Sequence, residues 1–142
     1  MKVSGNAIVL TNGKFDTKSA KTAHGLIRGS KRFIIKSVID DKFHAKYVHS
    51  NKHGNVFMST TKSNIPVFKN VESFLEAGID VNYCIIGVAS AGGILPKEMR
   101  NEVILALNNN ISIVNGLHSI LNYDSQLKKI AEDKNVKIYD VR

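Results

Sequence analysis

Short apolar runs alternate with helix-like segments along the whole chain. The runs are almost continuously apolar, as expected for strands buried on both faces of a sheet. They cover residues 7–10, 33–38, 65–68, 83–89, 112–115 and 137–139. Strands that alternate with helical segments in this way are typical of βαβ units and a parallel sheet. The pattern therefore predicts an α/β fold with a mostly parallel sheet of five to six strands.

Four helices are expected between these strands. The first covers residues 18–28, whose alanines, leucine and isoleucine recur at helical spacing, and Gly29 follows at the position of a C-cap. Asn70 is the expected N-cap of a short second helix, and Pro96 suits the first position of a third. A last helix is expected to start at Asp124.

One segment, residues 41–64, has no sustained period. It is polar and contains four lysines and three histidines. We expect a long loop or a broken helix there, with a strand fragment at residues 56–58. Because no internal repeat, low-complexity tract or Pro-rich linker interrupts the chain, a single domain over residues 1–142 is expected.

The positive charge is concentrated in the first part of the chain. The 142 residues have a formal net charge of +8, but residues 1–62 hold twelve basic and three acidic side chains, a net of +9. Such asymmetry favours an anionic partner that docks on one side. Nucleic acid is one candidate partner for a protein this basic. The basic segment has few aromatic residues and shows no known nucleic-acid module, so we expect a small anionic ligand instead.

A disulfide-bonded protein, a secreted or membrane protein and a metal-binding protein are not expected. Cys84 is the only cysteine, so no intrachain disulfide can form, and the first apolar run is far shorter than a signal-peptide core or a membrane span of about 20 residues. We therefore expect a cytoplasmic protein without a membrane partner. His44, His49 and His53 would point to different faces of a helix among repelling lysines, so no metal site is expected.

The loop after the first strand is the leading candidate for a phosphate site. It combines a glycine, small hydroxyls and three lysines just before a helix, where free N–H groups favour an anion. It matches neither the Walker A pattern nor the G-x-G-x-x-G pattern. The alternative is a solvated basic helix start. The predicted ligand contacts are Asn12, Gly13, Lys14, Lys21, Thr22 and Arg28.

Three other strand ends should reach the same edge of the sheet. An aspartate after the second strand suits a ribose hydroxyl or a simple turn, and adjacent glycines after the fourth strand let a ligand approach the backbone. A histidine after the fifth strand is a candidate general base, with a structural role as the alternative. The predicted ligand contacts are Asp40, Ser90, Gly92, Gly93, Asn115 and Gly116, and the catalytic candidate is His118.

Several motifs in a fixed order resemble a known family. They are KTAHGLIR at residues 21–28, IPVF at 65–68, ASAGGILP at 89–96, GLH at 116–118 and IYDVR at 138–142. The chain resembles the N-terminal Rossmann-like domain of the domain of unknown function 1611 family. The resemblance implies a three-layer fold that precedes a P-loop, nucleotide-binding domain. The resemblance also implies a link to D-glutamate N-acetyltransferases, because some full-length members of the family are enzymes of this kind. Those enzymes pair with an amino-acid epimerase.

The chain stops at Arg142, where the family continues into the P-loop domain. We therefore expect either the N-terminal domain of a longer protein or a stand-alone homologue with a separate partner. The order of elements in residues 65–115 is also similar to CoA-binding Rossmann-like domains such as that of succinyl-CoA synthetase. The resulting hypothesis is a domain that binds CoA, acetyl-CoA or an adenine nucleotide within an N-acyltransferase. Lys14, Lys21 and Arg28 would hold phosphates. The alternatives are an assembly module that forms homo-oligomers or docks a P-loop domain, and a small basic nucleic-acid-binding protein.

Overall fold

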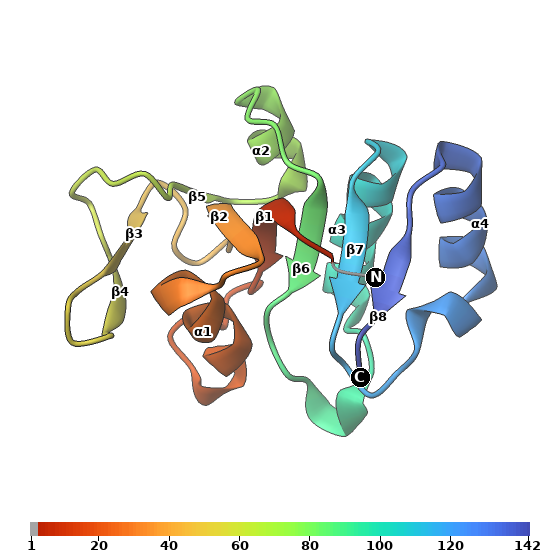
Figure 1. Cartoon of the computed structure of the whole chain (residues 1–142), viewed down its shortest axis with the longest axis horizontal. Helices are drawn as coiled ribbons and strands as arrows, with labels where there is room; N and C mark the ends of the chain where they lie inside the picture. Colours follow the sequence, from red (N-terminus) through yellow and green to blue (C-terminus); the bar gives the residue numbers. More distant parts are fainter. Residues whose placement is uncertain (1–2) are drawn as a thin grey trace.

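A six-stranded sheet forms the centre of the molecule (Figure 1). The structure is a computed structural model and describes residues 3–142. All pairings in this sheet are parallel, and the strand order is β5-β2-β1-β6-β7-β8. The strands are β1 (Gly5–Leu10), β2 (Phe33–Ile39), β5 (Val67–Phe68), β6 (Tyr83–Ile86), β7 (Ser112–Asn115) and β8 (Ile138–Asp140). The prediction of an α/β fold with a mostly parallel sheet is confirmed, although β6 ends three residues before the predicted strand end.

Four α-helices and three short 3-10 turns connect the strands. They are η1 (Lys18–Ala20), α1 (Lys21–Gly29), α2 (Val71–Glu76), η2 (Ala91–Gly93), α3 (Lys97–Asn108), η3 (Leu121–Tyr123) and α4 (Ser125–Lys134). The side chain of Asn70 caps α2 as predicted. Asp124, where the last helix was expected to start, is the N-cap of α4, which begins at Ser125. Pro96 is the N-cap of α3 and not its first residue. Gly29 is the last residue of α1, and the C-cap is the extended Ser30. Among residues 3–142, no helix has the length and apolarity needed to cross a membrane.

The helices divide unequally between the two faces of the sheet. The chain steps from β1 to β2 in one direction and from β6 through β7 to β8 in the other. Because these crossover connections all have the same handedness, they place α1 on one face of the sheet and α3 and α4 on the opposite face. The helix α2 packs against α3, and α3 packs against α4, so these three share a face. Within the part of the chain that the structure describes, no helix covers β7 and β8 on the side of α1 (Figure 1).

A β-hairpin takes the place of a crossover helix between β2 and β5. Its strands β3 (Tyr47–Ser50) and β4 (Val56–Ser59) pair antiparallel. The predicted strand fragment is therefore present, but the expected loop or broken helix was wrong. The hairpin is held because Val48 is buried in a second apolar cluster with Phe15, Val38 and Val67. Because these partners come from other parts of the sequence, the local pattern around Val48 did not predict β3.

Helix α1 approaches the sheet very closely at Gly87, just after β6. The Gly87 nitrogen donates to the Leu10 oxygen over 2.9 Å, and its oxygen accepts from the Ala23 nitrogen over 3.2 Å. A Cβ atom at residue 87 would overlap Cγ1 of Val9 and lie 3.1 Å from Cβ of Ala23. Glycine is therefore required because Val9 of β1 and Ala23 of α1 leave no room for a side chain, and not because of a turn. This contact joins the start of α1 to the exit of β6.

We expect Gly87→Ala to lower the free energy of unfolding by about 1 to 3 kcal/mol, because the added methyl group overpacks this contact. Urea denaturation followed by circular dichroism measures the change. Gly29→Ala is the matched control, since a Cβ there meets nothing within 4 Å. The control should change the free energy of unfolding by less than about 0.5 kcal/mol. Equal stability of the two variants would contradict the packing role of Gly87.

Candidate functional site

Two cavities adjoin the loop that follows β6, residues 88–90. The first, here called the crevice, lies between the ends of β1 and β6 and the start of α3, and it has a volume of about 390 Å³. This is where the strand order reverses, the usual ligand position in open α/β sheets. The crevice is lined by Thr11, Asn12, Lys14, Ser19, Asp41, Val88, Ala89, Ser90, Ala91, Pro96, Glu98 and Met99.

Asp40 holds the loop after β1 against the end of β2. Its carboxylate accepts from the Thr11 hydroxyl over 2.6 Å, from the Phe15 nitrogen over 3.3 Å and from the Lys42 nitrogen over 3.0 Å. The side chain is fully buried. These bonds use both carboxylate oxygens, so Asp40 positions the loop. Asp41, which sequence reasoning passed over, is the carboxylate that lines the crevice.

The loop after β1 presents Asn12 and Lys14 to the crevice. Asn12 has a φ of 42° and Gly13 a φ of 85°, so both lie in the left-handed region that a tight turn requires. Within residues 3–142, the buried side-chain oxygen of Asn12 has no hydrogen-bond partner. A buried acceptor of this kind is available to a donor on a ligand or to water. Lys14 supplies a cation to a site that also holds the carboxylates of Asp41 and Glu98.

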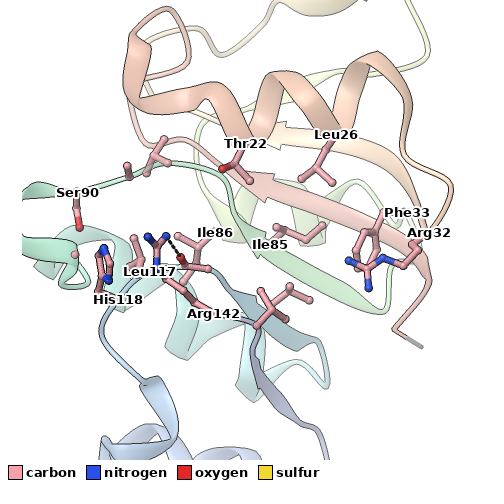
Figure 2. A pocket seen from close by; sticks show the side chains of 16 residues that line it. Thr22, Leu26, Arg32, Phe33, Ile85, Ile86, Ser90, Leu117, His118 and Arg142 are labelled. Carbon is pink, nitrogen blue, oxygen red and sulfur yellow. Dashed lines mark hydrogen bonds between the residues drawn. The ribbon is translucent and has the colours of Figure 1, made fainter. Parts of the chain in front are cut away.

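The second cavity, here called the groove, lies on the face of the sheet that carries α1 (Figure 2). Its volume is also about 390 Å³. Figure 2 shows Ser90, His118 and Arg142 toward one end and Arg32 and Phe33 at the other. The groove is lined by Thr22, Leu26, Arg32, Phe33, Ile85, Ile86, Val88, Ala89, Ser90, Gly93, Val114, Gly116, Leu117, His118, Val141 and Arg142.

Gly93 places His118 at the groove. Gly93 has a φ of 69°, and a Cβ atom on it would lie 2.5 Å from Cβ of His118. The Ser119 nitrogen also donates to the Gly93 oxygen over 2.9 Å. The loop after β6 and the loop after β7 are thus packed together, and only glycine leaves room for the imidazole. His118 is exposed and lines the groove.

A buried amide and a carboxylate shape the loop that carries His118. Asn115 is fully buried, and its Nδ2 donates to Oδ1 of Asp140 and to the Ser119 oxygen, both over 2.8 Å. Asp140 also accepts from the Leu121 nitrogen and from the backbone and side chain of Asn122. Burial raises the pKa of Asp140, but these hydrogen bonds outweigh it and hold the pKa below its ordinary value.

The predicted site residues, which are the ligand contacts and the catalytic candidate His118, separate into three groups. Asn12, Lys14 and Ser90 line the crevice. Thr22, Ser90, Gly93, Gly116 and His118 line the groove. Gly13, Lys21, Arg28, Asp40, Gly92 and Asn115 line neither cavity. The expected single crevice is therefore two cavities that share residues 88–90, and the ligand roles stay predictions.

The rotation of α1 about its axis explains why the basic residues of the predicted phosphate site do not line the same cavity. Thr22 and Leu26, four residues apart, face the groove. Lys21 is one residue out of phase with them, and Cδ of Arg28 instead lies beside Gly54 in the hairpin turn. Sequence reasoning missed Arg32 and Arg142, which line the groove, because neither belongs to a recognisable loop motif.

The strand order, with a cavity at its reversal point, defines a Rossmann-like α/β domain. Residues 49–142 match the profile of DUF1611_N, a domain of unknown function described as a Rossmann-like domain. The chain belongs to this family, which confirms the resemblance seen in the sequence.

Three comparisons place the chain among known proteins. It is 33% identical over 58 residues to a D-glutamate N-acetyltransferase from Tritonibacter scottomollicae, covering 41% of this chain and 17% of that protein. A crystal structure of a DUF1611 family protein from Anabaena variabilis has a TM-score of 0.76 and 28% identity, over 96% of this chain and 37% of that one. Homoserine dehydrogenase from S. aureus, with a TM-score of 0.50 and 13% identity over 99% of this chain and 32% of that one, shows the fold alone. The chain thus spans well under half the length of each.

We expect Asp140→Asn to lower the free energy of unfolding at pH 7 by about 1 to 3 kcal/mol, because several donors lose their charged acceptor. The folded-state pKa of Asp140 is lowered, so its contribution is present above the unfolded-state pKa of about 3.9 and is lost as the pH falls through the folded-state value. Urea denaturation at pH 7 and at pH 3 should therefore show the difference from the wild type shrinking in acid.

The matched control is Asp133→Asn, which removes an exposed carboxylate paired with Lys129 on one turn of α4. It should change the free energy of unfolding by less than about 0.5 kcal/mol. A loss for Asp140→Asn that is the same at both pH values would contradict the role of its charge.

Proposed function

We propose that this domain binds a phosphorylated small ligand, either CoA or acetyl-CoA or an adenine nucleotide, in the crevice. The site would belong to an N-acyltransferase similar to D-glutamate N-acetyltransferase. The observation that carries the proposal is the position of the crevice at the reversal of strand order. Its wall includes Lys14 and the Asn12 side-chain oxygen, which has no hydrogen-bond partner among residues 3–142.

The charges of the crevice favour a nucleotide-like ligand over a bare anion. Lys14 attracts a phosphate, and the start of α3 beside Pro96 adds the positive end of a helix dipole. Asp41 and Glu98 repel a free phosphate ion but accept hydrogen bonds from ribose hydroxyls or an adenine amine. A ligand with both an anionic part and several donors therefore satisfies the site best.

His118 is the acid/base candidate of the proposed enzyme. Ser90 lines both cavities, so a ligand that extends from the crevice past Ser90 comes to the end of the groove that holds His118. In acyl transfer to an amine, a neutral imidazole takes the proton that the attacking nitrogen releases. Acyl transfer is supported by the name of the Tritonibacter relative, whose matching part covers less than half of this chain.

Isothermal titration with acetyl-CoA, ATP and NAD tests the ligand. We expect binding of acetyl-CoA or ATP, and Lys14→Ala should weaken it about tenfold, the effect of losing one charge-assisted hydrogen bond. Lys18→Ala is the control, since Lys18 is exposed and lines neither cavity. Folded protein that gives no heat with any of the three compounds would contradict the proposal.

A second candidate function is a non-catalytic assembly module. Ile94, Ile120 and Tyr123 are 62%, 40% and 83% exposed, and they border one shallow hollow beside η3. Exposed apolar groups that lie together in this way often mark a contact with another protein surface. The partner would be a second copy of the chain or a P-loop domain.

Light scattering distinguishes this second function. For an assembly module we expect light scattering to give the molar mass of a dimer. Tyr123→Ser should give the mass of a monomer, because it removes a large exposed side chain from the hollow. Tyr139→Phe, which changes a half-buried side chain away from the hollow, should leave the mass unchanged. A wild-type chain that is strictly monomeric and still binds acetyl-CoA would count against the assembly function.

A further inference from the structure

We propose that the groove is a second ligand site, separate from the crevice, and that it binds a small organic anion. This ligand would consist of an apolar body and one carboxylate or phosphate monoester head group. The volume of about 390 Å³ is that of a small-molecule site. The inference goes beyond the proposed function, because it requires no ligand in the crevice.

The charges of the groove differ from those of the crevice. Its lining includes two guanidinium groups, on Arg32 and Arg142, together with His118. Among residues 3–142, none of those that line the groove carries a carboxylate side chain, whereas the crevice has two such residues. Apolar walls reduce the local dielectric and strengthen the attraction between the two guanidinium groups and an anion. The groove therefore selects a negatively charged ligand more strictly than the crevice does.

The middle of the groove suits an apolar body. Ile85 of β6 and Val114 of β7 are partners across the two strands, and Leu117 follows close by. Helix α1 borders this surface through Leu26 without covering it (Figure 2). Helix α1 packs against β2, and Ile85 and Val114, which are almost fully buried, form the floor of the groove beside it. Val141, which is 58% exposed, borders the same surface. A ligand that displaces water from this surface gains hydrophobic free energy.

The end of the groove near β7 suits the head group. Figure 2 shows the guanidinium of Arg142 close to Leu117 and His118, with Ser90 beyond. Arg142 donates one long hydrogen bond of 3.4 Å to the Gly116 oxygen, and its remaining N–H groups can pair with two oxygens of one anion. Arg32, at the opposite end, stacks over the ring of Phe33 at 5.7 Å. Arg142 is therefore the cation that binds the head group.

Amide NMR titration of the 142-residue chain tests the ligand class. Hexanoate and hexyl phosphate are the two anionic probes, and hexanamide is a neutral probe of similar size. We expect at least one anion to shift the amide signals of Ile85, Val114 and Gly116, and hexanamide to bind at least about fivefold more weakly. The anion that binds more tightly identifies the head group. Equal binding of hexanamide, or no shift at these residues with any probe, would overturn the proposal.

Variants show whether the groove itself binds the probe. Thr22→Trp places a large ring at the wall of the groove and should abolish anion binding. Lys18→Trp, at an exposed position four residues earlier that lines neither cavity, should keep the wild-type affinity. Arg142→Gln should weaken the anion about tenfold and leave hexanamide unchanged. Anion binding that survives both Thr22→Trp and Arg142→Gln would overturn the proposal.

Lys14→Ala separates this inference from the proposed function. Lys14 lines the crevice only, so its loss should weaken acetyl-CoA or ATP and leave the affinity of the anionic probe unchanged. Equal weakening of both ligands would show a single site and overturn the separate groove. Intact probe binding in a chain that binds neither acetyl-CoA nor ATP would support the groove while contradicting the proposed function.

Discussion

The close contact between α1 and the end of β6 determines the geometry of both cavities. Gly87 has no side chain, so Ala23 and Val9 approach its backbone directly. The Ala89 nitrogen then donates to the Ser19 oxygen over 2.8 Å, which ties the loop after β6 to the turn that precedes α1. The crevice and the groove both border this loop, and both are lined by residues 88–90. Their separation therefore depends on one point of backbone packing, where overpacking by a single methyl group is costly.

The unequal covering of the sheet explains why a groove exists at all. A parallel sheet normally has both faces covered by its crossover helices. Here the connections from β6 through β7 to β8 place α3 and α4 on the face opposite α1, and α1 borders the groove on its own face. The apolar side chains of Ile85 and Val114 consequently border a cavity. In the proposed function and the further inference, two ligands of different charge pattern would meet near Ser90 and His118, an arrangement suited to group transfer between them.

Local signals predicted the elements of the fold, whereas long-range contacts decided the exceptions. The buried strands were found because they are continuously apolar, and the caps at Asn70 and Asp124 act within one helical turn. Strand β3 of the hairpin was missed because it is mostly half-exposed, and its buried residue Val48 packs against Phe15 from another part of the chain. The strand before Gly87 was predicted too long for a similar reason, since residues 87–89 are apolar but turn away to contact α1.

The sequence by itself determined the fold class, the family and the excess of positive charge in the first 62 residues. Only the tertiary structure decided which charges face a cavity. Lys14 lines the crevice, while Lys21 and Arg28 line neither cavity, because the packing of α1 on Gly87 sets the rotation of that helix. Arg142 is more than 100 residues from Lys14 in the sequence, and it lines the groove because β8, which precedes it, pairs with β7. Helix rotation and strand order are properties of the packed molecule, and no short stretch of sequence encodes them.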